Sequence, residues 1–273
     1  MRRNYGHPAR HLQNFPPLLI AVDADPVLGE TAIERLRAAT GLPARDADTA
    51  DLVLYRGIER LELRAAGMRP LAVDFHSGKA RHRRLHGGGK GQLVARAAGL
   101  RKYPRATILD ATAGFGQDAF VLASLGARVT LLERSAVVHA LLADGLARAA
   151  REPELREIVA RMTLIHADAR LWLTTTETRP EVVHLDPMFP PSTKRARAKK
   201  PMQCLHRLLG QDEDADRLLT LARRYATRRV CVKRARHAPA LGGAVPDAQI
   251  LGKRSRYDLY SPIQRNATTS SKA

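Results

Sequence analysis

The spacing of hydrophobic residues changes near residue 106. From there on, short apolar runs alternate with amphipathic stretches of helical period, the pattern of a parallel sheet with crossover helices. The runs predict strands at Thr107–Asp110, Val129–Glu133, Thr163–His166, Val182–Leu185 and Val230–Lys233, and two late strands at Gln249–Leu251 and Tyr257–Tyr260. The stretches between them predict helices at Asp118–Leu125, Ala136–Ala150, Pro153–Arg161 and Asp214–Tyr225. We therefore expect an open, mostly parallel α/β sheet that ends in a β-hairpin.

The first third of the chain predicts a smaller unit. Two short apolar runs, Leu18–Val22 and Leu52–Tyr55, lie on either side of the helical pattern Glu30–Ala39, and a third run, Leu71–Phe75, follows. This order predicts a small N-terminal α+β lobe. The predicted organisation is a flexible basic N-terminus (1–16), the lobe (17–76), a basic connector (77–102), the sheet domain (103–262) and a flexible tail (263–273).

Charge and composition narrow the function classes. Lys and Arg number 46 against 27 Asp and Glu, and the resulting net charge of +19 favours a polyanionic partner such as nucleic acid or an anionic membrane surface. No run approaches the ~20 apolar residues of a membrane span. The two cysteines are too few for a disulfide framework, which fits a reducing compartment. We expect a cytoplasmic protein that does not enter a membrane.

A glycine-containing turn follows the first strand of the predicted sheet, in the segment Asp110-Ala111-Thr112-Ala113-Gly114-Phe115-Gly116-Gln117-Asp118. In open α/β sheets, ligands bind where the carboxyl ends of strands meet the amino termini of helices. Gly114 and Gly116 permit a tight turn and a close approach of a ligand to the backbone. With Ala119 they also match the G-x-G-x-x-G/A dinucleotide pattern, and Glu133 follows about 20 residues on, so a nicotinamide cofactor is one alternative.

Acidic residues stand at the ends of the next two predicted strands. Glu133 ends the second strand, where its carboxylate can accept hydrogen bonds from both hydroxyls of an adenosine ribose; the alternative is an ordinary surface acid. Asp168 follows the third strand, where it can accept a hydrogen bond from an adenine amino group or cap the next helix. The two roles of Asp168 are compatible with each other.

The fourth predicted strand runs directly into Asp186-Pro187-Met188-Phe189-Pro190-Pro191. An acid, a turn restricted by proline and an aromatic ring suit a planar amine. Asp186 and the Pro187 carbonyl can accept hydrogen bonds from an exocyclic amino group, and Phe189 can stack on the base. The alternative is a proline-rich end to a strand.

At these residues the chain resembles S-adenosylmethionine (SAM)-dependent methyltransferases that modify exocyclic nitrogens. A wider set of segments is similar to the RsmJ family of 16S ribosomal RNA (guanine-N2)-methyltransferases. These segments are Val73-Asp74-Phe75, Ala80-Arg81-His82-Arg83-Arg84, Gly87-Gly88-Gly89-Lys90-Gly91, Asp118-Ala119-Phe120-Val121-Leu122-Ala123-Ser124 and Val232-Lys233-Arg234. The similarity covers residues 50–260 and implies a Rossmann-like methyltransferase fold for the sheet domain, with 16S rRNA or the small ribosomal subunit as the partner.

The resemblance also implies contacts with the cofactor, SAM. It places them at Gln117-Asp118, Glu133-Arg134, Asp168-Ala169 and Asp186, to which the glycine turn adds Asp110, Gly114 and Gly116. The chain departs from the family pattern at two places. The family usually has Arg in place of Gln117, and small hydroxyl residues in place of Asp168 and Ala169.

The chemistry of methyl transfer suggests roles for the residues of the fourth turn. The methyl group of a sulfonium is already activated, so positioning of the nucleophile matters more than a strong base. Hydrogen bonds from guanine N2 to Asp186 and the Pro187 carbonyl favour the more tetrahedral, cationic nitrogen of the transition state. Asp186, Pro187 and Phe189 are therefore the predicted catalytic residues. No metal is needed, and Cys204 and His206 fall short of a zinc site.

Basic residues precede the glycine turn and follow the Asp186 turn. The segment His76–Lys102 contains no Asp or Glu, and a second basic run follows Pro191. We expect both to hold RNA phosphates without reading the sequence of bases. The predicted RNA-binding residues are Lys79, Arg81, Arg83, Arg84, Lys90, Lys194, Arg195, Arg197, Lys199 and Lys200.

Two other functions remain open from the sequence. One is an NAD-dependent oxidoreductase that uses the same glycine turn, which leaves residues 186–190 and the basic segments without a role. The other is a non-catalytic rRNA-binding assembly factor whose donor pocket is vestigial. A base inside structured RNA must leave its stack to reach such a pocket, so the methyltransferase hypothesis also predicts an extruded or unpaired target.

Overall fold

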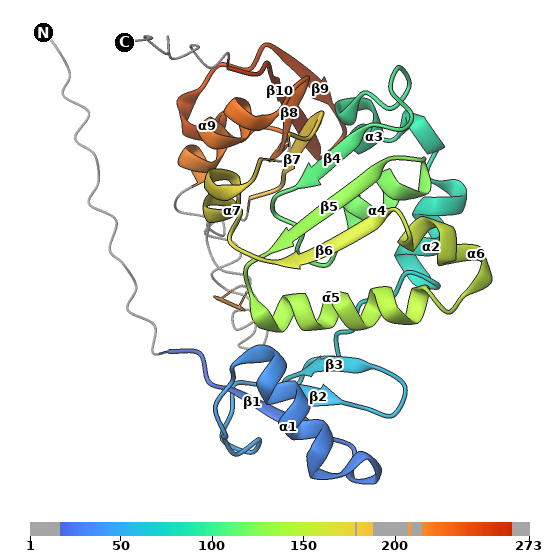
Figure 1. Ribbon diagram of the computed structural model, residues 1–273, viewed down its shortest axis with the longest axis vertical. Helices are drawn as coiled ribbons and strands as arrows, with labels where there is room; N and C mark the ends of the chain where they lie inside the picture. The colour runs from blue at the N-terminus through green and yellow to red at the C-terminus, as the bar shows by residue number, and fades with distance from the viewer. Residues whose placement is uncertain (1–16, 178, 188–206, 209–214, 264–273) are drawn as a thin grey trace, which may run out of the picture.

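A seven-stranded sheet runs through the larger part of the molecule (Figure 1). The computed structural model describes residues 17–177, 179–187, 207–208 and 215–263, and for Lys79 the backbone only. The strands of this sheet are β4 (Thr107–Asp110), β5 (Arg128–Glu133), β6 (Met162–His166), β7 (Val182–Leu185), β8 (Arg229–Ala235), β9 (Ala248–Leu251) and β10 (Ser255–Tyr260). All seven were predicted, with ends that differ by no more than two residues.

The order of the strands is β6-β5-β4-β7-β8-β10-β9. The first five run parallel, whereas β10 lies antiparallel between β8 and β9. The connection from β9 to β10 is the predicted terminal hairpin. The Rossmann-like, mostly parallel open sheet is therefore confirmed. Its order changes direction at β4, so the carboxyl ends of β4 and its neighbours form the crevice where such sheets bind ligands.

Helices cover both faces of the sheet (Figure 1). On one face, α3 (Leu93–Ala98), α4 (Gln117–Ser124) and α5 (Ala136–Ala149) share a core with β4 through Ile108. On the other face, α7 (Ala169–Thr175) and α9 (Ala215–Tyr225) share a second core with β4 through Leu109. Burial on both faces explains why these strands appear in the sequence as continuous apolar runs. None of the helices in the described part of the chain has the length and apolar character that a membrane span requires.

The N-terminal lobe is a three-stranded sheet with one helix. It consists of β1 (Ile20–Ala24), α1 (Gly29–Thr40), β2 (Leu52–Arg56) and β3 (Leu61–Arg64), with β1 and β2 parallel and β3 antiparallel to β2. The third apolar run of the lobe, Leu71–Phe75, is not a strand, since only Leu71 forms a single bridge, to Leu63. The sequence did not reveal β3, because charged residues occupy every second position of Leu-Glu-Leu-Arg and mask the apolar pattern.

The segment predicted as a basic connector contains two helices. These are α2 (Gly78–His86) and α3, separated by the short 3-10 helix η2 (Gly89–Gly91). Four residues of α3 are buried, and both helices contact α4, so the segment is part of the sheet domain's packing. The many basic residues hide its apolar face in the sequence, since the helix α3 is only six residues long. A further short helix, α6 (Pro153–Val159), packs against α4 and α5.

The lobe packs on α5, as Figure 1 shows, and one carboxylate ties the two together. Asp144 on α5 accepts hydrogen bonds from the Arg56 guanidinium, from the Leu61 N–H at 3.2 Å and from Arg148 Nε at 2.8 Å. The next residue is Gly145, where a Cβ atom would lie 2.6 Å from Val73 Cγ1. The polar anchor therefore lies beside a close contact that only glycine permits.

Loss of this anchor is expected to destabilise the fold. Asp144→Ala leaves two arginines and one backbone N–H without their acceptor, and a broken buried ion pair costs about 3–5 kcal/mol, less here because Arg56 is partly exposed. Urea unfolding should report a loss of about 2–3 kcal/mol. The control is Glu30→Ala, which removes a solvent-exposed pair with Arg37 at 3.8 Å. A loss for Asp144→Ala no larger than that of the control would contradict the role of the anchor.

Candidate active site

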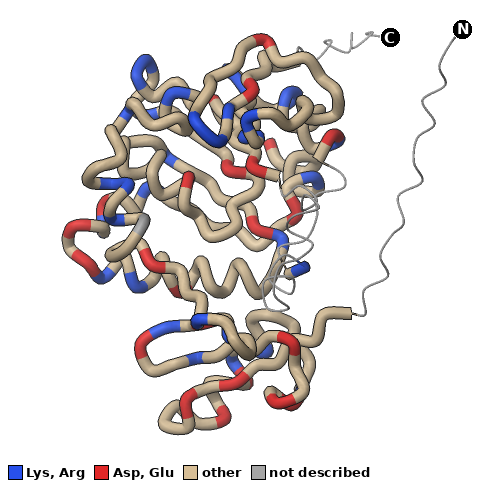
Figure 2. The backbone as a smooth tube through the Cα atoms, turned by 180° about the vertical axis from the view of Figure 1, so that it is seen from behind, with Lys and Arg blue, Asp and Glu red and all other residues tan. Residues whose placement is uncertain are grey.

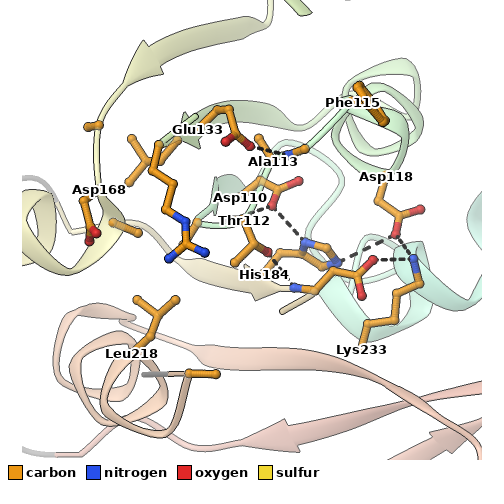
Figure 3. Close-up of a pocket in the computed structure, with 18 of the residues that line it drawn as sticks. Asp110, Thr112, Ala113, Phe115, Asp118, Glu133, Asp168, His184, Leu218 and Lys233 are labelled. Atoms are coloured by element: carbon orange, nitrogen blue, oxygen red, sulfur yellow. Dashed lines mark hydrogen bonds and ion pairs between the residues drawn. The ribbon is translucent and has the colours of Figure 1, made fainter. Parts of the chain in front are cut away.

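A cavity of about 340 Å³ opens at the carboxyl ends of the parallel strands (Figure 3). A volume of this size suits a small organic ligand. Nine of the ten residues predicted to bind SAM line it, and Gly116 alone does not. The nine are Asp110, Gly114, Gln117, Asp118, Glu133, Arg134, Asp168, Ala169 and Asp186. The fold thus gathers residues from β4, β5, β6 and β7, far apart in the sequence, around one space.

The two glycines of the turn after β4 have different roles. Gly114 has φ +53° and nothing within 4 Å of the position of a Cβ atom, so its backbone is open to a ligand. Gly116 has φ +69°, and a Cβ atom there would lie 2.8 Å from Leu142 Cδ1. Gly114 therefore offers the close approach that the sequence predicted for both, whereas Gly116 serves the packing of the turn.

Glu133 connects the glycine turn to the end of β5. Its two carboxylate oxygens accept hydrogen bonds from the Gly114 N–H at 2.9 Å and the Ser135 N–H at 2.7 Å. The surface-acid alternative does not describe it, because only 9% of the residue is exposed. Each carboxylate oxygen has a second lone pair, so Glu133 can still accept hydrogen bonds from ribose hydroxyls.

Asp168 caps the helix α7 and is paired with an arginine. Its carboxylate accepts hydrogen bonds from the Arg170 N–H at 2.8 Å and from the Arg170 guanidinium at 2.6 Å. These bonds from Arg170 lower the pKa of Asp168 to about 2, against the raising effect of partial burial. The helix-cap hypothesis is confirmed, and Asp168 also lines the cavity, where it remains a candidate acceptor for an adenine amino group.

The lining suits SAM in shape and in chemistry. Gly114 supplies an open stretch of backbone, Glu133 supplies acceptors for ribose hydroxyls, and Leu218 of α9 supplies an apolar wall. Asp168 and Glu133 lie toward one end of the cavity and Asp118 and Lys233 toward the other (Figure 3). When bound, SAM supplies an activated methyl group on a sulfonium. In the described part of the chain, no three His, Cys, Asp or Glu side chains are grouped so as to hold a metal ion.

A chain of buried polar groups lies under the cavity, on the face of the sheet that α4 covers. The strand register pairs Asp110 of β4 with His184 of β7, and His184 Nδ1 lies 3.2 Å from Asp110 Oδ1. On the other side, His184 Nε2 lies 3.4 Å from the hydroxyl of Tyr257. Burial would lower the pKa of His184, but the carboxylates of Asp110, Asp118 and Asp186 together raise this pKa above the usual value. Asp110 is thus held by a histidine directly under the turn.

Asp118 lies at the centre of a second group of charges. Its carboxylate accepts hydrogen bonds from Arg83 Nη2 at 2.8 Å, from Lys233 Nζ at 2.8 Å and from the Tyr257 hydroxyl at 3.2 Å. Burial alone would raise the pKa of Asp118, but Lys233, His184 and Arg83 together hold it well below the usual value. Asp118 is therefore a fixed anion beside the cavity.

Asp186 is bound to the same group of charges through Lys233. Its N–H donates to Thr112 Oγ1 at 2.6 Å, and its Oδ2 accepts a hydrogen bond from Lys233 Nζ at 2.7 Å. Burial raises the pKa of Asp186 above its usual value, although the Lys233 ammonium opposes the shift. The side chain nevertheless keeps 41% of its surface exposed, toward the cavity. Pro187 is buried directly after it, and Phe189 lies outside the described residues.

The predicted RNA-binding residues have different surroundings. Arg83 lines the cavity and pairs with Asp118, and Arg84 donates to Glu154 at 3.0 Å. The basic segment thus contains no acid in sequence, but two of its arginines contact acids of α4 and α6 in space. Arg81 and Lys90 have no carboxylate partner within the described ranges. The side chain of Lys79 and the run from Lys194 to Lys200 lie outside the described residues.

The lobe does not share the positive charge. Residues 17–76 contain seven Lys or Arg against ten Asp or Glu, and Figure 2 shows the acidic positions spread over the lobe. The excess of positive charge therefore lies entirely outside the lobe, in the rest of the chain. A polyanion is attracted to that part and not to the lobe.

Four site residues received no role from the sequence: Thr112, His184, Lys233 and Tyr257. A signal for His184 is present, since it is the one polar residue in the buried strand Val-Val-His-Leu. The sequence indicated Lys233 only as part of the segment Val232-Lys233-Arg234, which resembles the family. Its proximity to Asp186 depends on the neighbouring positions of β7 and β8, and its proximity to Tyr257 depends on the pairing of β8 with β10.

Comparisons with known proteins agree with this site. Residues 35–262 match the family model described as "Putative SAM-dependent methyltransferase". The chain is 47% identical over 257 residues to the ribosomal RNA small subunit methyltransferase J of Laribacter hongkongensis, covering 91% of each chain. It is 48% identical over 245 residues to the protein of the same name from Chromobacterium violaceum, covering 87% of this chain and 94% of that one.

A solved structure shows the same fold. The crystal structure of the SAM-dependent methyltransferase NGO1261 from Neisseria gonorrhoeae matches with a TM-score of 0.72 and 35% identity, covering 90% of this chain and 97% of that one. Both matches cover about nine tenths of this chain. The chain therefore belongs to the ribosomal RNA small subunit methyltransferase J family of SAM-dependent methyltransferases.

Proposed function

We propose that this protein transfers a methyl group from SAM to the exocyclic N2 of a guanosine in the rRNA of the small ribosomal subunit. The names of its relatives support an rRNA substrate. The choice of an amino group as the target rests on Asp186, which lines the cavity and keeps 41% of its side chain exposed. Its position suits an acceptor for an N–H group of a base presented to the methyl donor.

Different residues of the cavity have different roles in the reaction. Glu133 and Asp168 bind and orient the nucleoside part of the cofactor. Asp186 and the Pro187 carbonyl accept hydrogen bonds from the amino group of the base, which aligns the nitrogen lone pair with the methyl group. As the N–CH₃ bond forms, the S–CH₃ bond breaks and S-adenosylhomocysteine is the leaving group. The positive charge passes to the nitrogen, where the Asp186 carboxylate stabilises it until one N–H proton is lost. Phe189 is proposed to stack on the base, as expected from its sequence position.

The alternatives make different use of the same cavity. An NAD-dependent oxidoreductase would leave Asp186 and its bond to Lys233 without a role. An assembly factor that does not catalyse would not need a cavity open beside Asp186.

Isothermal titration should show binding of S-adenosylhomocysteine and none of NAD. Purified protein should then transfer a labelled methyl group from SAM to undermethylated small subunits. Binding of NAD, or binding of S-adenosylhomocysteine without transfer, would contradict the proposal.

The proposal includes contact of RNA phosphates with the basic run after the Asp186 turn. Its support is the sequence, because this run lies outside the described residues. An rRNA partner and two cysteines also favour a cytoplasmic protein.

Neutralising the basic run is expected to weaken the salt dependence of RNA binding. Each lost phosphate contact on single-stranded RNA removes about 0.7 from the slope of log affinity against log salt. Changing Arg195, Arg197, Lys199 and Lys200 to Gln should therefore reduce the slope by about 3. The control changes Arg35, Arg37, Arg45 and Arg69 of the acidic lobe to Gln and should leave the slope unchanged. Equal slopes for the two variants would count against the contact.

A further inference from the structure

Lys233 lies between two carboxylates at the edge of the cavity. Its Nζ donates to Asp186 Oδ2 at 2.7 Å and to Asp118 Oδ2 at 2.8 Å, and 31% of its side chain is exposed (Figure 3). It comes from β8, whereas Asp186 follows β7 and Asp118 lies in the first turn of α4. The three side chains are brought together only by the fold.

The Asp118 carboxylate, one of the two partners of Lys233, is held in place by other residues. Asp118 is nearly buried, and Arg83 and the Tyr257 hydroxyl bind it besides Lys233. Tyr257 is also the partner of Lys233 in the pairing of β10 with β8, so two contacts locate the lysine. The Lys233 ammonium is thus held beside Asp186 in a fixed position.

The bond to Lys233 leaves one oxygen of Asp186 for a ligand. Oδ2 is occupied by Lys233, whereas Oδ1 makes no hydrogen bond within the described residues. The backbone of Asp186 is fixed separately by Thr112 Oγ1. With its backbone and one oxygen held, the carboxylate has a defined direction, and its free oxygen is available to the cavity.

We propose that Lys233 is a positioning residue for methyl transfer: it holds Asp186 Oδ2, keeps the carboxylate anionic, and leaves Oδ1 for the amino group of the base. This inference rests on the proposed function, in which Asp186 accepts that hydrogen bond. A merely structural lysine would stabilise the fold through Asp118 and would leave the pH dependence of kcat unchanged.

The charges around Asp186 determine what loss of Lys233 does. Lys233 of β8 and His184 of β7 favour the anion, whereas burial and Asp118 of α4 favour the protonated acid. Lys233 is the only one of these groups that donates a hydrogen bond to the Asp186 carboxylate in the described structure. Its removal should therefore raise the pKa of Asp186 further, by about 1–3 units for loss of an adjacent cation.

The first test needs no substrate. The carboxyl signal of Asp186 is followed by ¹³C NMR in protein labelled at aspartate and is assigned with Asp186→Asn. The titration midpoint should rise by at least about one unit in Lys233→Met and stay near that of the wild type in Lys233→Arg. The control, Arg128→Met, removes an exposed cation at the amino-terminal end of β5, away from the carboxyl ends that form the cavity, and should not shift the midpoint. An unchanged midpoint in Lys233→Met would overturn the inference.

A double variant controls for misfolding of Lys233→Met. Lys233→Met leaves the Asp118 anion with fewer partners, so Lys233→Met is also combined with Asp118→Asn. Removal of the Asp118 charge alone should lower the Asp186 midpoint, because that charge favours the protonated acid. A midpoint in the double variant above that of Asp118→Asn alone therefore reports the loss of Lys233, and equal midpoints would overturn the inference.

The second test is the pH profile of kcat for methyl transfer to undermethylated small subunits. The rate should fall as Asp186 gains a proton, so its acidic limb should move to higher pH in Lys233→Met by the same shift as the NMR midpoint. KM for RNA should remain within about threefold, and Lys233→Arg should recover most of kcat. If the wild type transfers no methyl group, the proposed function fails, and the NMR shift then shows only that Lys233 controls the titration of Asp186. If the wild type is active and the acidic limb stays in place, the inference alone fails.

Discussion

Asp186→Ala is expected to reduce kcat for methyl transfer by at least about 100-fold, the loss typical for removal of one aligned electrostatic contact in a transition state. The variant loses the acceptor that orients the amino group and stabilises the positive charge on nitrogen. It also leaves Lys233 with only Asp118 as a carboxylate partner in the described structure. Single-turnover transfer of labelled methyl groups to undermethylated small subunits measures the effect without a contribution from product release.

The affinity for RNA should be nearly unchanged in Asp186→Ala. Phosphate contacts dominate such affinities, and Asp186 is a carboxylate inside the cavity. Asp186→Asn is the matched variant, because it keeps the shape and one acceptor oxygen but loses the charge. We expect its rate to lie between those of the wild type and Asp186→Ala. Near-normal turnover by Asp186→Ala would remove Asp186 from the mechanism.

Glu133→Ala is expected to weaken the binding of S-adenosylhomocysteine by about 10- to 100-fold, the equivalent of one or two hydrogen bonds to a charged acceptor. The variant loses the acceptors for the ribose hydroxyls. It also releases the N–H groups of Gly114 and Ser135, which hold the glycine turn to the end of β5. Isothermal titration with the purified protein measures the change.

Two controls separate these contributions to the Glu133 effect. Glu133→Gln keeps one acceptor oxygen for the turn and loses the charge, so its affinity should be intermediate. Glu177→Ala removes an exposed acid outside the cavity and should leave the affinity unchanged. An affinity of Glu133→Ala within about twofold of the wild type would show that Glu133 does not hold the cofactor.

The central strands β4 and β7 were predictable from the sequence because they are buried on both faces. Val182–Leu185 and Thr107–Asp110 were predicted with their observed bounds, since an apolar run between turns leaves few alternatives. The strand β3 was not predicted, because its Glu62 alternates with leucines and is buried against Arg60 and Arg64. The helix α3 was missed for a related reason, because basic residues surround its short apolar face.

The cofactor side of the site was more predictable than the group around Asp186. Glu133 and Asp168 follow their strands directly, and the carboxyl ends of parallel strands meet at one edge, so their convergence follows from topology. Lys233 approaches Asp186 from the next strand, and Tyr257 approaches Lys233 through an antiparallel pairing with β10. Such contacts depend on the register between strands, and a single sequence does not specify that register.

The most direct test of the account is to identify the methylated atom. Small subunits from cells that lack this protein are incubated with the purified protein and SAM that carries a deuterated methyl group. Their rRNA is then digested and analysed by nucleoside mass spectrometry, with Asp186→Ala in parallel. We predict label in N2-methylguanosine at one rRNA position, formed at least about 100-fold more slowly with the variant. Label on an adenosine, on a ring nitrogen or on a ribosomal protein, or equal label with Asp186→Ala, would contradict the account.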